Sequence, residues 1–355
     1  MANLSLILSG NDSFGFSTNK TFLQTTLARG LNWTFLPVFS LTILILALLT
    51  NGTVLSLFLR NRSLCTAFNI YLINLLIANV LNMLTQVPVF LLNALAGDTW
   101  WTGHMTCNLY LYGFIFQTTI LQAIMSNSHV LITVNRLWAV LMPLSYRRHH
   151  TRGTAFFLCA FMWIWVHAFK MAYLIRDALY FRPPEGQFGC NYNRPAQQGM
   201  ALVNQYLIFN VPLASMILAY PVICYRQWKR SRRAIVAPQE MQQMRTANTA
   251  VTSQHEKTLE NPATGTVAGR SMRPTKKPKR KSQAFLVLTC VTISMVVAWL
   301  PSIVYYTIIL HRKVNWPGFQ QAATVLWYVE SVIDPVLFTC AVTDLRNEFR
   351  RLIRI

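Results

Sequence analysis

Seven apolar stretches, each about 20 residues or longer, are the feature that most restricts what this chain can fold into. They lie at 35–59, 69–95, 108–134, 154–175, 201–225, 284–310 and 321–341. A helix needs about 20 mostly apolar residues to cross the hydrocarbon core of a bilayer. The chain is also 53% hydrophobic and only 12% charged, which is too apolar for an ordinary soluble domain. The sequence therefore predicts an all-α membrane protein, with a seven-transmembrane helix bundle at 35–341.

The basic residues lie in alternate loops. They follow the first and third spans, flank the long connection at 227–282, and close the chain at 346–354. Loops rich in lysine and arginine stay on the cytoplasmic side, so we expect an extracellular amino terminus in a multi-pass protein of the plasma membrane. The net charge of +21 then faces the lipid headgroups of the inner leaflet, and we expect no nucleic-acid partner.

Residues 1–34 have the character of an extracellular segment. They contain Asn-x-Ser/Thr sequons, which accept glycans in exported segments, at Asn3, Asn11, Asn19 and Asn32. Of the seven cysteines in the chain, Cys107 and Cys190 lie at the predicted extracellular side. Disulfides form in that oxidising compartment, so we expect these two cysteines to pair.

Two cytoplasmic segments differ from the spans. Residues 227–282 are rich in Gln, Thr, Ala and basic residues, which is the composition of a disordered loop. After the seventh span, residues 342–355 place Leu345, Phe349 and Leu352 on one helical face. This pattern predicts an amphipathic helix on the surface of the membrane.

Short motifs occur in most of the spans. They are TNGTV in the first, NLLIANVL in the second, NRLWAVLMPLSYR in the third, FNVP in the fifth, AWLP in the sixth and SVIDPVLF in the seventh, with Trp163 or Trp165 as a fourth-span tryptophan. In this order they resemble the rhodopsin-like (class A) G-protein-coupled receptors. The second cytoplasmic loop and the WYVESVIDPVLF segment look most similar to the amine branch, of muscarinic and histamine type. The resemblance implies a receptor, not an enzyme, that passes an extracellular ligand signal to a heterotrimeric G protein.

The resemblance also locates a ligand pocket. Amine receptors pair the ligand ammonium with a third-span aspartate, but counting from Cys107 reaches Phe114 and counting back from Arg136 reaches Thr118, one helical turn later. Neither is an acid, so a conventional monoamine is not expected. Amides and aromatic rings suit a neutral polar, amphiphilic or peptide ligand, or an ammonium held by aromatic rings. The expected lining is Phe114, Gln117, Thr118, Gln122, Asn204, Gln205, Trp299, Tyr305, Tyr306, Trp327 and Tyr328. Tyr328 occupies the position of the retinal-binding lysine of opsins, so opsin chemistry is not expected.

In the predicted core of the bundle, an acid lies on a different span from the usual acid of the family that this chain resembles. The family usually has a second-span aspartate and a seventh-span asparagine, whereas the corresponding residues here are Asn79 and Asp334. Glu330 lies one turn before Asp334 on the same face. Two buried carboxylates cannot both ionise cheaply, so we expect them to share a proton or to hold a cation such as sodium, together with Asn51, Asn79 and Ser331. No other cofactor is expected; a passive polar core is the alternative.

Arg136 matches the family arginine that contacts the G protein in the active state. At rest, a neighbouring acid and often an acid at the foot of span six hold this arginine, but here those places have Asn135 and Lys281. Loss of a charge-assisted contact costs about 1.5–3 kcal/mol, which leads to the hypothesis of raised basal signalling. The alternative is another polar contact, for example to Asn69, that restores the resting state. The residues expected to act in coupling and activation are Asn135, Arg136, Tyr220, Lys281, Trp299, Pro301, Asp334, Pro335 and Phe338.

Two other functions remain open at this point. The altered residues Asn135, Asp334 and Phe338 also suit a non-signalling scavenger or decoy receptor. A transporter that uses Glu330 and Asp334 is less favoured, because the chain has no internal repeat and many transporters are built from repeats. The expected partners are therefore a heterotrimeric G protein, an extracellular ligand of unknown class and the lipid bilayer.

Overall fold

A computed structural model describes residues 33–96, 109–181, 193, 195–230, 232, 279–312 and 316–353. Within these residues the secondary structure is helical throughout, and seven helices are long and apolar enough to cross a membrane. The predicted bundle of seven spans is therefore confirmed. The seven spans are α2 (Phe35–Arg60), α3 (Ala67–Ala96), η2 (Leu109–Ile115) with α5 (Phe116–Leu141), α7 (Arg152–Arg176) with η3 (Asp177–Phe181), α8 (Gln198–Gln205) with η5 (Tyr206–Asn210) and residues 211–230, α10 (Lys279–Arg312), and α11 (Pro317–Ala341).

The first span shows why this bundle needs a lipid environment. One side of α2 exposes Val38, Ile45 and Leu49, whereas Ala47 and Asn51 on the other side are buried against the bundle. Exposed apolar surface of this extent is unfavourable in water, and a continuous helix satisfies its own backbone hydrogen bonds in hydrocarbon. The outward apolar side chains therefore face lipid, and the polar side chain points inward.

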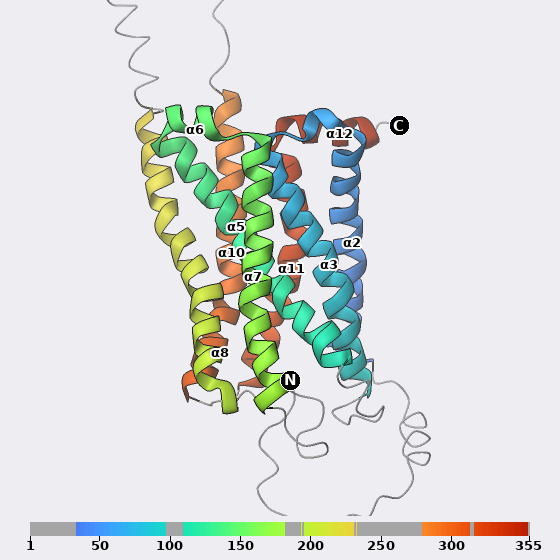
Figure 1. Cartoon of the computed structure of the whole chain (residues 1–355). Helices are drawn as coiled ribbons and strands as arrows, with labels where there is room; N and C mark the ends of the chain where they lie inside the picture. The colour runs from blue at the N-terminus through green and yellow to red at the C-terminus, as the bar shows by residue number, and fades with distance from the viewer. Residues whose placement is uncertain are drawn as a thin grey trace, which may run out of the picture.

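The spans pack in a bundle that α5 crosses obliquely (Figure 1). Helix α10 packs on α11, α2 packs on α3, and α3 packs on α5. The short helices α6 (Pro143–His149) and α12 (Thr343–Ile353) lie at the same end of the bundle, at the top of Figure 1. The basic residues of α6 and α12 lie at this end, which is the expected cytoplasmic face.

The predicted amphipathic helix after the seventh span is present as α12. Leu345 is fully buried, and Phe349 and Leu352 pack against the core. On the polar side, Asn61 at the end of α2 donates a hydrogen bond to Glu348 Oε2 at 3.1 Å. Apolar contacts and one polar link therefore hold α12 against the ends of the spans.

A series of side-chain hydrogen bonds connects three spans and shows which tryptophan of the fourth span contacts another helix. The Trp163 indole N–H on α7 donates to Asn74 Oδ1 on α3 at 2.7 Å. Asn74 Nδ2 in turn donates to Ser128 Oγ on α5 at 2.8 Å. Trp165 is 44% exposed on the outer surface. Trp163 is therefore the residue that connects the helices, and Trp165 faces outward.

Trp163→Phe should destabilise the bundle, because it removes the donor to Asn74 and leaves the oxygen of a half-buried amide unpaired. We expect a loss of about 0.5–1.5 kcal/mol, measured as a fall of a few degrees in the apparent Tm of the purified chain in detergent. Trp165→Phe makes the same chemical change on the outer surface and is the matched control. Equal shifts in the two variants would contradict this role for Trp163.

Candidate functional site

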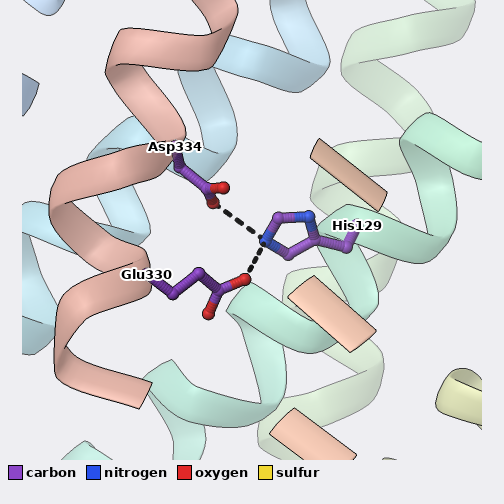
Figure 2. A group of neighbouring side chains, drawn as sticks. All are labelled: His129, Glu330 and Asp334. Carbon is purple, nitrogen blue, oxygen red and sulfur yellow. Dashed lines mark ion pairs between the residues drawn. The ribbon is translucent and has the colours of Figure 1, made fainter. Parts of the chain in front are cut away.

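The most unusual feature of the bundle is a buried cluster of three ionisable side chains. Glu330 and Asp334 lie one turn apart on α11, and each has about 1–2% of its surface exposed. His129 on α5 points at both: its Nε2 lies 3.5 Å from Glu330 Oε1 and 3.2 Å from Asp334 Oδ2 (Figure 2). The structure thus brings together the two acids that the sequence placed on one face, and adds a histidine from another helix.

Sequence reasoning missed His129. The residue lies seven positions before Arg136 on α5, which places both on about the same face of the helix. An ionisable residue inside an apolar span is costly and is a default functional candidate. This signal was available in the sequence, but the identity of its partners was not.

Other polar groups surround the cluster. The Trp299 indole N–H, on α10, donates to Glu330 Oε2. Asn51 Nδ2 donates to the Ser331 carbonyl at 2.8 Å, and Asn79 Nδ2 donates to Asn51 Oδ1 at 3.3 Å. Asn51, Asn79 and Ser331 therefore form a network beside the acids. In the part of the chain that the structure describes, these hydrogen bonds join the three residues to one another and do not reach the carboxylates.

The predicted ligand-pocket residues divide into two groups. Some make contacts between helices: Gln205 Nε2 donates to the Ile303 carbonyl on α10 at 3.5 Å, and Tyr305 donates to Gln320 Oε1 at 3.1 Å. Others have buried polar atoms with no hydrogen-bond partner among the described residues, namely Thr118 Oγ1, Asn204 Oδ1 and Trp327 Nε1. The second group is the better candidate for contact with a ligand.

The aromatic residues of the expected pocket form two groups of rings in contact. Trp299 meets Trp327 edge-on with ring centres 5.6 Å apart, and Trp327 stacks on Tyr328 at 5.6 Å. Tyr305 contacts Tyr306 edge-on at 5.5 Å. Such contacts favour rigid positions for large rings, so these residues form a preformed apolar wall. Gln117, Gln122 and Tyr306 are half-buried.

The start of the third span departs from an α-helix, where the two sequence counts disagreed by one turn. Residues Leu109–Ile115 form a π-helix, which has i→i+5 hydrogen bonds and therefore more residues per turn. Counting with α-helical spacing does not carry across such a segment. Phe114 lies in it, but its side chain is outside the described residues.

Two buried ionisable side chains of the fourth span, Lys170 and Asp177, were also missed from the sequence. Lys170 on α7 is 4% exposed, and its ammonium lies 5.1 Å from the centre of the Phe209 ring. Asp177 is fully buried; its Oδ1 accepts hydrogen bonds from Gln197 Nε2 at 3.2 Å and from the Asn193 backbone N–H at 3.3 Å. Both residues lie within the fourth span, where ionisable side chains are signals of function or of paired burial.

At the cytoplasmic end, an aromatic ring takes the place of an acid beside Arg136. The guanidinium lies 3.8 Å from the centre of the Phe68 ring on α3, and within the described ranges no carboxylate forms an ion pair with it. Asn135 Nδ2 donates to the Tyr146 hydroxyl at 3.5 Å. Asn69 was the alternative polar contact considered for Arg136. Its side chain donates instead to the Leu64 carbonyl at 2.7 Å, and the neighbouring residue Phe68 contacts Arg136.

The remaining predicted activation residues lie on the spans or outside the described part. Pro301 and Pro335 lie inside α10 and α11, Phe338 is fully buried, and Tyr220 is half-buried. The Lys281 side chain is outside the described residues. So are the glycosylation sites and both cysteines of the expected disulfide, Asn3, Asn11, Asn19, Asn32, Cys107 and Cys190.

The second cytoplasmic loop packs on the bundle through stacked rings around His150. The His150 ring stacks on Tyr146 at 4.3 Å and on Tyr71 of α3 at 6.0 Å. Burial, and secondly the positive charge of Arg136, lower the pKa of His150 below its ordinary value. The neutral imidazole is therefore the form that this packing favours.

A helix bundle of seven spans, with polar residues buried between the helices and an amphipathic helix after the last span, defines a multi-pass helical membrane protein. The family of 7 transmembrane receptors (rhodopsin family) matches residues 50–338. The chain belongs to this family, so it is a multi-pass membrane receptor and not an enzyme.

Individual relatives are distant and carry different names. An octopamine receptor beta-2R from Chilo suppressalis is 26% identical over 327 residues, covering 87% of this chain and 77% of that protein. A QRFP-like peptide receptor from Branchiostoma floridae is 22% identical and covers 89% of this chain and 77% of its own length. A melanopsin from Podarcis siculus is 25% identical over 48% of this chain and 35% of its own length. The similarity to the octopamine receptor agrees with the resemblance to amine receptors.

Acidification should loosen the second cytoplasmic loop through His150. Because the pKa of His150 is lowered in the folded protein, the unfolded chain binds a proton first as the pH falls through about 6.5. Stability is therefore full above that pH and is lost below it. We expect the apparent Tm in detergent to fall between about pH 7.5 and about pH 5.5, and to fall less in His150→Gln. His149→Gln, at an exposed neighbouring position, should keep the wild-type pH dependence. An unchanged slope in His150→Gln would contradict this account.

Proposed function

We propose that the protein is a receptor that transmits an extracellular ligand signal to heterotrimeric G proteins, and that it signals at a raised basal level. The amino terminus is extracellular in this proposal, and the end that carries α6 and α12 faces the cytoplasm. The main support for a raised basal level is the contact of Arg136 with the Phe68 ring, because an acid would otherwise hold the arginine at rest. The family of the chain supports a signalling role.

The size of the effect follows from the two kinds of contact. A charge-assisted hydrogen bond contributes about 1.5–3 kcal/mol, whereas a cation–π contact contributes about 0.5–2 kcal/mol. A difference of about 1 kcal/mol shifts a two-state equilibrium roughly five-fold. The resting state would then be restrained, but less strongly than by an acid next to Arg136.

The ligand is proposed to be neutral and polar, amphiphilic or a peptide, or to present an ammonium group to aromatic rings. The buried Thr118 Oγ1, Asn204 Oδ1 and Trp327 Nε1 supply a few polar contacts in an otherwise aromatic setting, which is the usual composition of a ligand site. The wall of Trp299, Trp327 and Tyr328 supplies rings that bind apolar or cationic groups.

Ligand-free nucleotide exchange tests the signalling proposal. Membranes that contain the wild-type chain should accelerate exchange on at least one G protein of a panel, and Arg136→Ala should abolish this at equal surface expression. Asn135→Asp restores an acid beside Arg136 and should lower basal exchange about five-fold to ten-fold.

Asn135→Gln is the matched control, because it keeps an uncharged amide and should retain basal exchange. Silence of the wild type with every G protein would overturn the proposal and favour a scavenger or decoy receptor. Equal activity of Asn135→Asp and the wild type would leave coupling intact but contradict the role assigned to position 135.

A panel of monoamines tests the ligand proposal. Octopamine should not activate the wild-type chain, because residues 109–141 contain no acid and the Asp177 carboxylate already accepts hydrogen bonds from Gln197 and Asn193. The octopamine receptor of Chilo suppressalis in the same cells is the positive control. A saturable response of this chain to octopamine would contradict a neutral ligand and would favour an ammonium group held by aromatic rings.

A further inference from the structure

The cluster of His129, Glu330 and Asp334 has a charge that the described residues do not balance. With a neutral imidazole, two ionised carboxylates carry a charge of −2 in a site that is almost fully buried. No lysine or arginine among the described residues forms an ion pair with either acid. An uncompensated buried charge is strongly unfavourable, so the site requires two protons, one proton together with a monovalent cation, or a cation of charge +2.

The distances fit poorly to a proton held by hydrogen bonds. His129 Nε2 lies 3.2 Å and 3.5 Å from the two carboxylate oxygens, whereas charge-assisted N–H···O contacts are about 2.7–2.9 Å long. One N–H could be shared by two oxygens only in a three-centre bond, and Nε2 has no hydrogen bond to any described group. Asp334 Oδ1 is likewise buried without a hydrogen-bond partner in the described ranges.

The same distances fit the edges of a metal coordination polyhedron. Zinc ligands of nitrogen and oxygen lie about 2.0–2.2 Å from the metal, so two ligands of a tetrahedron are about 3.3–3.6 Å apart. The distance of 3.5 Å from His129 Nε2 to Glu330 lies within this range, and the distance of 3.2 Å to Asp334 lies just below it. One donor atom from each of the three residues lies within 4.8 Å of the others, and Figure 2 shows all three converging on one point.

The donor set indicates which class of ion would bind. Hard cations such as calcium and magnesium take oxygen ligands, and an imidazole nitrogen favours zinc, copper, iron or nickel. The Trp299 indole N–H bonds the outer oxygen, Oε2, of Glu330. Such a hydrogen bond orients a carboxylate ligand from behind.

We propose that His129, Glu330 and Asp334 bind one divalent transition-metal ion of the zinc type in the core of the bundle. The ion cancels the charge of two carboxylates and connects α5 with α11. Three protein ligands leave one position of a tetrahedral site for water. The proposal does not rest on coupling to a G protein.

Metal content of the full-length protein tests the proposal. The chain is expressed with zinc in the medium, purified in detergent, dialysed against a weak chelator and measured by elemental analysis. The wild type should retain one zinc ion per chain. His129→Gln removes the nitrogen ligand with little change in size and should lower the retained zinc at least ten-fold.

His167→Gln is the matched control. His167 lies on α7, and its Nδ1 lies 2.8 Å from the Trp163 carbonyl; among the described residues it forms no ion pair with an acid. This variant should retain zinc as the wild type does. Glu330→Gln and Asp334→Asn reduce the buried charge, so they remain informative if His129→Gln fails to fold; each should also lower the retained zinc.

Replacement of zinc by Co²⁺ gives a second readout. The wild type should show the intense visible absorption of low-symmetry Co²⁺, and His129→Gln should not. A folded wild type that retains no metal, or a His129→Gln variant that retains it fully, would overturn the proposal. Thermal stabilisation by Na⁺ with none by Zn²⁺ would overturn it as well. None of these readouts depends on nucleotide exchange, so failure of the metal site is distinguishable from failure of signalling.

Discussion

The burial of two carboxylates beside one imidazole is the constraint on which the rest of the bundle depends. Hydrocarbon does not solvate polar groups, so each charge in the core must be balanced by another group from the protein or by a bound ion. Glu330 and Asp334 reach His129 across the bundle, and Trp299 adds a donor from α10. Three spans therefore meet at one polar centre, and their relative positions are tied to its charge.

This centre and the cytoplasmic end share a helix. His129 and Arg136 lie about two turns apart on α5, so a change in the packing of α5 on α11 would also move the arginine. At that end Arg136 rests on Phe68, a contact that has less directional restraint than an ion pair. The contacts of His129 fix the core, whereas Arg136 is only weakly restrained at the cytoplasmic end. We therefore expect the resting state of the receptor to depend on the core.

The sequence predicted those features that are local or periodic. The seven spans follow from length and apolar content, and the shared face of Glu330 and Asp334 follows from their spacing of one turn. Trp163 and Trp165 could not be separated, because only packing against Asn74 distinguishes them. The contacts of His129 with α11 and of Arg136 with Phe68 join different spans. Such contacts depend on the rotation and tilt of whole helices, and on the π-helical start of the third span, which local patterns do not contain.

The most direct test of this account is a double-mutant cycle between His129 and Asp334 on the stability of the purified receptor. His129→Gln, Asp334→Asn and the double variant are unfolded under the same conditions as the wild type. We expect the double variant to lose at least about 1 kcal/mol less stability than the sum of the two single losses, because each single variant leaves a partner in the core unpaired. Losses that add within about 0.5 kcal/mol would contradict it, since the two side chains would then not interact across the bundle.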